Sequence, residues 1–170
     1  MCLALLEKIN SLFDKLLKQV VIIVMGAMLA VIFVQVIARY VFHNSLSFSE
    51  ELARYLFVWC VFLCLPVVHR RGGHMVVGVL SERLEGFPLK ALRLVAQFLT
   101  LVFMIIIFKN GITMIQRTYF QTSPALQIKM SYVYYALPIG SAAMILNTIE
   151  EMLKTLKKPS SETKPQLHLD

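Results

Sequence analysis

Four long stretches without a charged residue limit what this chain can fold into. Two are 20 residues long and two are shorter, at 14 and 15 residues; in chain order they are Gln19–Ala38, Tyr55–Val68, Leu94–Phe108 and Met130–Ile149. A helix needs about 20 mostly apolar residues to cross the ~30 Å hydrocarbon core of a bilayer. The shorter stretches reach that length with their preceding residues, because Arg54 and Arg93 can extend their guanidinium groups to the interface. The sequence therefore predicts an all-α membrane protein with four transmembrane helices, at about residues 19–42, 50–69, 91–116 and 124–153.

The composition agrees with a membrane protein. Hydrophobic residues make up 58% of the 170-residue chain and charged residues only 16%, whereas soluble domains average about 45–50% and about 25%. We expect one transmembrane domain over residues 1–156. The first apolar stretch is too long for the core of a cleaved signal peptide and follows a charged arm, so we expect it to remain as an anchor.

The distribution of basic residues predicts the orientation of the chain. Of its 17 lysines and arginines, 12 lie before the first span, between the second and third spans, or after the fourth, and the remaining five lie on the other side. Loops rich in lysine and arginine stay in the cytoplasm, which predicts that both termini and the central loop are cytoplasmic. The net charge of +7 then indicates attraction to anionic phospholipids, and nucleic acid is not expected as a partner.

Three further segments are expected outside the spans. The arm at about residues 3–19 has apolar residues at three- and four-residue spacing, which predicts an amphipathic helix lying flat on the membrane surface. A similar stripe predicts a short interfacial helix at about residues 74–86, between the second and third spans. The tail at residues 157–170 contains two prolines and few apolar residues, which is typical of disorder.

Neither the cysteines nor the histidines predict an enzyme. Cys60 and Cys64 lie within the second span, whereas a disulfide-exchange enzyme needs a Cys-x-x-Cys motif at the aqueous edge. A membrane haem needs two imidazoles at the same depth, but His43 is expected at the outer end and His69 and His74 at the inner end. We expect no catalytic residues, no cofactor and no metal.

Charged residues gather where the first two spans are joined. Arg39 ends the first span, and Ser49, Glu50, Glu51 and Arg54 begin the second. Acidic residues suit a helix N-terminus, and Glu50 and Arg54 have the favourable i,i+4 order for an ion pair. We interpret the cluster as a hairpin clamp or an anchor to a partner. A transport site is less favoured, because such sites normally lie near the membrane midplane.

Two parts of the sequence resemble one family of membrane transport proteins. They are Phe48–Trp59 followed by Arg70–Met75, and Ser123–Leu126 followed by Tyr134–Gly140. The first resembles the pattern of an acidic pair, Ala-Arg, Phe-Val-Trp and a basic turn ending in His that occurs in the small (Q, DctQ-like) subunit of tripartite ATP-independent periplasmic (TRAP) transporters. The second resembles that family's last span, in which Pro124 suits the first helical turn and Pro138 is expected to kink the helix. The resemblance covers about residues 18–153.

The resemblance implies an accessory role in the bacterial inner membrane. It implies a large membrane subunit that carries substrate and sodium by an elevator motion, and a periplasmic binding protein that delivers an organic anion, such as sialic acid or a C4-dicarboxylate. The small subunit is then a rigid scaffold. By the resemblance Glu50, Glu51 and Arg54 anchor its periplasmic end, and Trp59 packs against neighbouring helices or lipid. Arg70, Arg71 and His74 would hold the cytoplasmic turn to headgroups or to the large subunit.

Other functions stay open on the residues alone. A stand-alone four-helix drug/proton transporter needs an acidic residue near the middle of a span, and no Asp or Glu lies near the middle of any predicted span. A scaffold for an unrelated membrane complex would have the same pattern of apolar stretches. The uniform apolarity of the spans does not indicate which helix face meets a partner.

Overall fold

The computed structural model describes residues 2–43, 47–70 and 87–157 as an all-helical protein. Its elements in chain order are α1 (Cys2–Tyr40), α2 (Ser47–Arg70), α4 (Phe87–Arg117), α5 (Ser131–Tyr134) and α6 (Ala136–Lys157). Four segments are long and apolar enough to cross a membrane: Phe13–Tyr40, Ser47–Arg70, Pro88–Arg117 and Ser131–Leu156. The predicted four-span all-α fold is confirmed.

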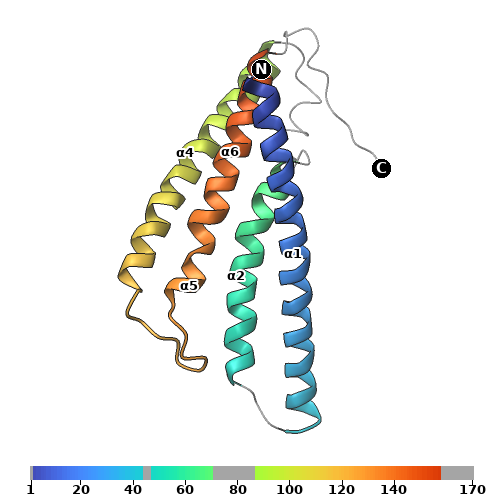
Figure 1. Cartoon of the computed structure of the whole chain (residues 1–170), viewed down its shortest axis with the longest axis vertical. Helices are drawn as coiled ribbons and strands as arrows, with labels where there is room; N and C mark the ends of the chain where they lie inside the picture. The colour runs from blue at the N-terminus through green and yellow to red at the C-terminus, as the bar shows by residue number, and fades with distance from the viewer. Residues whose placement is uncertain (1, 44–46, 71–86, 158–170) are drawn as a thin grey trace.

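The four long helices form an open row rather than a closed bundle. Along the row α1 contacts α2, α2 contacts α6, and α6 contacts α4, while α1 and α4 have no close backbone contact in the parts of both that are described. Figure 1 shows this order, with α1 and α4 at the two edges. In a closed four-helix bundle every helix has two neighbours. Here the edge helices have apolar surface that none of the described helices covers.

Burial follows the order of the row. In the most apolar part of each span, 50% of the residues are buried in α5–α6 and 28% in α2, against 11% in α4 and none in α1. On α1 the less exposed residues recur every three or four positions: Leu17, Val21, Val24, Met28, Val31, Gln35 and Ala38. This repeat averages 3.5 residues, the spacing with which one helix packs along another. In the described part of α1, this narrow seam packs against the rest of the protein.

The two central helices approach each other most closely at Gly140 of α6. A Cβ atom at this position would lie 2.4 Å from the carbonyl oxygen of Phe62 and 2.8 Å from its carbonyl carbon. Pro66 lies inside α2, four residues after Phe62, and has no N–H to donate to that carbonyl. Small residues let membrane helices pack backbone to backbone, so Gly140 sets the spacing between α2 and α6.

The fourth span begins later than expected. The sequence predicts a start near Pro124, but α5 begins at Ser131, and residues 118–130 form a loop with a β-bridge between Thr122 and Lys129. The helix is interrupted at Tyr135, close to the predicted kink, because Pro138 has no N–H for the carbonyl of Tyr134 four residues earlier.

Several other segments can be compared with the prediction. The arm at about residues 3–19 is helical, but it is the beginning of α1 and not a separate helix. The expected interfacial helix at 74–86 lies outside the described residues, as does the tail after Lys157.

Candidate functional site

The row has polar contacts at each of its two ends. We call the end where α1 is joined to α2 and α4 to α5 the hairpin end; its residues are 39–43, 47–55 and 117–130, which include the loop 118–130. The opposite end, where α1 and α4 begin and α2 and α6 finish, we call the termini end. The chain begins at the termini end, beside the last turns of α6 (Figure 1).

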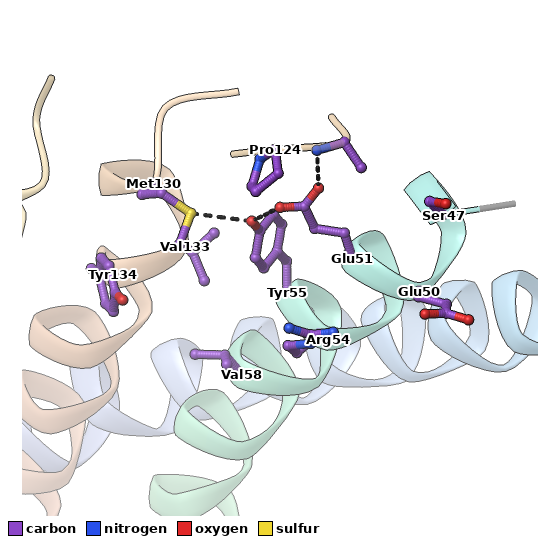
Figure 2. A pocket seen from close by; sticks show the side chains of 11 residues that line it. Ser47, Glu50, Glu51, Arg54, Tyr55, Val58, Pro124, Met130, Val133 and Tyr134 are labelled. Carbon is purple, nitrogen blue, oxygen red and sulfur yellow. Dashed lines mark hydrogen bonds between the residues drawn. The ribbon is translucent and has the colours of Figure 1, made fainter. Parts of the chain in front are cut away.

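At the hairpin end, Glu51 of α2 binds the loop between α4 and α5. Its Oε2 accepts hydrogen bonds from the backbone N–H groups of Ala125, at 2.9 Å, and Leu126, at 3.0 Å. Its Oε1 accepts a hydrogen bond from the hydroxyl of Tyr55, and the Tyr55 oxygen lies 3.1 Å from the sulfur of Met130. Figure 2 shows the Glu51 carboxylate pointing toward the loop. Glu51 therefore joins α2 to a segment more than 70 residues later in the chain.

The loop presents these N–H groups because its own hydrogen bonds fold it back on itself. Ser123 donates its N–H to the carbonyl of Ile128 at 2.9 Å, and Met130 donates to the carbonyl of Gln121 at 2.9 Å. The chain turns back within this loop at Gln127, which takes a positive φ of 53°. The Ser123 hydroxyl also accepts from the N–H of Leu126, at 3.2 Å. Two successive N–H groups are thereby directed at one carboxylate, which lies in the first turns of α2, where a negative charge is favourable.

The contacts of the predicted clamp residues differ from those expected. Glu51 is 8% exposed and holds the hairpin end together, but through the α4–α5 loop. The expected ion pair between Glu50 and Arg54 is not formed among the described residues: both side chains are exposed, and Glu50 points away from Glu51 (Figure 2). Glu50 and Arg54 instead line an open pocket of about 490 Å³ beside the loop.

The remaining predicted site residues lie apart from this cluster. Arg39 is exposed in the last turn of α1, where a cation is favourable. Trp59 packs against a buried cluster of α1, α2 and α6 that consists of Leu17, Leu63, Val67 and Ala143. Trp59 is thus a packing residue between helices. Arg70 lies at the termini end, and Arg71 and His74 lie outside the described residues.

At the termini end, three close contacts join ionisable side chains in the last turns of α2 and α6. His69 Nε2 lies 2.9 Å from an Oε2 of Glu151, and Arg70 Nη2 lies 3.9 Å from Oε1 of Glu150. Lys154 approaches the same Glu150 oxygen to 2.6 Å. Ionisable groups in membrane helices are normally paired inside the protein. These contacts hold α2 against α6 at the termini end. Further along the same two helices, Gly140 lets them pack closely.

The sequence patterns do not predict the contacts that His69, Glu150 and Glu151 make between α2 and α6. The one available signal was the i,i+4 spacing of Glu150 and Lys154. The partners on α2 are about 80 residues away, and nothing in the sequence indicates that α2 and α6 are neighbours.

Further hydrogen bonds continue the same connections. Asn147 of α6 donates to the carbonyl of Pro66 in α2 at 3.0 Å. Gln97 of α4 donates to the hydroxyl of Thr155 at 3.1 Å, and Lys90 donates to the carbonyl of Leu156 at 3.2 Å. Polar contacts thus join α2, α6 and α4 near the termini end, while Glu51 joins α2 to the α4–α5 loop. Among the residues placed by the structure, no group of three His, Cys, Asp or Glu side chains could hold a metal ion. The arrangement is suited to holding helices in place.

We predict that Glu150→Gln destabilises the termini end. The change keeps the size of a side chain that is 5% exposed but removes the charge that faces Arg70 and Lys154. We expect a loss of about 1–2 kcal/mol, since hydrogen bonds to charged groups contribute about 1.5–3 kcal/mol and Lys154 is half exposed. Thermal unfolding of the purified protein in detergent measures this. Glu50→Gln, which removes an exposed carboxylate, is the control; equal midpoints for the two variants would contradict the prediction.

Comparison with known proteins agrees with this architecture. Residues 28–158 match the family model described as the DctQ component of tripartite ATP-independent periplasmic transporters. A Haemophilus influenzae protein provisionally named as a TRAP transporter small permease is 28% identical over 155 residues, which cover 91% of this chain and 94% of that protein. The sialic acid TRAP transporter small permease protein SiaQ of Vibrio cholerae is 26% identical over 89% of this chain and 88% of its own length.

One longer relative contains the same region as a part. The isethionate TRAP transporter permease protein DctMQ of Oleidesulfovibrio alaskensis is 28% identical over 75% of this chain, but the match covers 22% of that protein. The family match extends over most of the chain and includes α2, α4, α5 and α6. This chain therefore belongs to the DctQ family, the small membrane component of TRAP transporters.

Proposed function

We propose that the chain is a rigid scaffold for the large membrane subunit of a TRAP transporter, which takes up an organic anion from a periplasmic binding protein with coupling to sodium. The observation that carries the proposal is the open row with polar contacts at both ends. The described helices contain no acidic or basic side chain near the middle of a span. The row therefore has the features of a support and lacks those of a transport pathway.

The open row also supports the expected partner. α1 and α4 have apolar outer faces that no other described helix of this chain covers, so they must meet lipid or another membrane protein. The match to a quarter of the Haemophilus influenzae sialic acid TRAP transporter permease SiaT fits a unit that acts beside a larger one. We propose that the large subunit covers part of this surface, and that sodium is bound there and not by this chain.

For orientation, we propose that the termini end is cytoplasmic and the hairpin end periplasmic, in the bacterial inner membrane. The charge distribution supports this, because only five of the 17 lysines and arginines are assigned to the hairpin end. Sialic acid is the first anion to test, since relatives named for sialic acid match over about 90% of this chain. The isethionate relative makes a small sulfonate the second.

Transport by reconstituted complexes tests the proposed function. The large subunit, with and without this chain, is placed in liposomes with the soluble binding protein and an inward sodium gradient. We expect sodium-dependent uptake of labelled anion with both membrane subunits, and at least a tenfold loss when this chain is omitted. Uptake by this chain alone would contradict the scaffold role and favour a stand-alone transporter.

A further inference from the structure

The exposed face of α2 is amphiphilic along its length. Five exposed residues recur at spacings that place them on one side of the helix: Glu50, Arg54, Phe57, Val61 and Val68. Both charges lie at the hairpin end, and the apolar side chains follow toward the termini end, with Phe57 56% exposed. This face has the polarity of a phospholipid, with a charged end followed by an apolar length.

The charged end of this face borders the open pocket. Glu50 and Arg54 line it together with apolar side chains of α2 and of the segment that begins α5, among them Val58, Met130 and Val133. Within the described residues no ion pair joins Glu50 to Arg54 or to another side chain. The nearby Glu51 carboxylate is already occupied by Tyr55 and the loop. The pocket is thus lined by one anionic and one cationic side chain, four residues apart in the sequence, and by apolar side chains.

We propose that this pocket binds a phospholipid headgroup that carries a phosphate and a primary ammonium but no carboxylate, that is, a phosphoethanolamine headgroup. The guanidinium of Arg54 binds the phosphate, for which its planar donors are suited. The carboxylate of Glu50 accepts a hydrogen bond from the ammonium. One acyl chain lies along Phe57 and Val61. From Arg54 to Leu65 the helix rises about 16 Å at 1.5 Å per residue, close to half of the ~30 Å hydrocarbon core.

Charge complementarity selects this headgroup over others. A choline headgroup has no N–H to donate to Glu50. A glycerol headgroup has no cation and brings its negative phosphate beside Glu50 and Glu51 with only Arg54 to offset it. The proposal concerns this chain alone and does not depend on the large subunit.

Native mass spectrometry of the full chain in detergent tests the proposal. Equimolar phosphatidylethanolamine, phosphatidylcholine and phosphatidylglycerol with identical acyl chains are added, and bound lipids are counted. We expect ethanolamine lipid to exceed choline lipid by about fivefold, the upper range for one exposed ion pair. Glu50→Gln should remove this preference, Arg54→Gln should reduce binding of both lipids, and Arg117→Gln, an exposed arginine at the same end of the row, should change neither.

Two results would overturn the proposal. One is equal binding of the three lipids by the unaltered chain. The other is an unchanged ethanolamine preference in Glu50→Gln and unchanged lipid binding in Arg54→Gln while the same variants fail to copurify the large subunit, which would assign the pocket to a protein contact. The transport assay above measures the scaffold role separately, so failure of the lipid proposal and failure of the scaffold proposal can be told apart.

Discussion

Replacing Gly140 by alanine should separate the two central helices and destabilise the protein more than any other single methyl group added to α6. The new Cβ would lie 2.4 Å from the Phe62 carbonyl oxygen and 2.9 Å from its Cβ. The nearest atoms belong to the backbone, so the helices must move apart rather than a side chain rotate. Overpacking costs about 1–3 kcal/mol and occasionally more, whereas alanine gains about 1 kcal/mol of helix propensity over glycine. We expect a net loss of about 2 kcal/mol.

The fluorescence of Trp59 can report this change. It is the only tryptophan of the chain and packs against the cluster that contains Leu63 of α2 and Ala143 of α6. Thermal unfolding followed by this signal in detergent should show a lower midpoint for Gly140→Ala. Gly26→Ala is the matched control, because nothing lies within 4 Å of a Cβ at that position, and its midpoint should not fall. A Gly140→Ala midpoint equal to that of the unaltered chain would show that α2 and α6 are not packed at this point.

Replacing Glu51 by glutamine should release the α4–α5 loop from α2. Glutamine keeps the size but loses the charge, and its amide group cannot accept from Tyr55, Ala125 and Leu126 together. Each hydrogen bond to a charged acceptor contributes about 1.5–3 kcal/mol, and about 1.4 kcal/mol changes an equilibrium tenfold. The population of the open loop should therefore rise at least about tenfold.

Limited trypsin digestion measures that opening, because Lys129 lies inside the loop. When opening is fast relative to cleavage, the cleavage rate follows the population of the open form. We expect cleavage after Lys129 to be at least about tenfold faster in Glu51→Gln. Tyr55→Phe, which removes one of the three hydrogen bonds, should have a smaller effect, and Glu50→Gln should have none. If Glu51→Gln and Glu50→Gln were cleaved at the same rate, Glu51 would not be what holds the loop.

The number of spans could be predicted from the sequence, because an uncharged apolar stretch of about 20 residues is typical of a membrane-spanning helix and of little else. The order of the helices in the row could not. All four spans are apolar around most of their surface. Hydrophobicity therefore does not distinguish a helix face that packs inside the protein, such as the face with Leu63, from a face that meets lipid. Gly140 and Pro66 take part in the close packing of α2 against α6. This role can be recognised only when the helix that lies opposite each residue is known.

The hairpin end shows the same limit at the level of single residues. The sequence drew attention to Glu50, Glu51 and Arg54, and local spacing favoured a pair between Glu50 and Arg54. In the structure Glu51 is the residue that binds the loop. Besides the Tyr55 hydroxyl, its partners are the backbone N–H groups of the loop, which no side-chain pattern reveals. Ser123 and Pro124 resembled a helix start, but the hydrogen bonds of the loop keep residues 118–130 out of the helix.

The central claim is that this chain works as a support for a larger membrane subunit, and copurification tests it most directly. The tagged chain is extracted from its native membrane in mild detergent, and the proteins that accompany it are identified by mass spectrometry. The scaffold account predicts a large polytopic membrane protein in a nearly one-to-one ratio, retained by the unaltered chain and by Gly26→Ala. Recovery of the chain alone, or only as a homodimer, would contradict it.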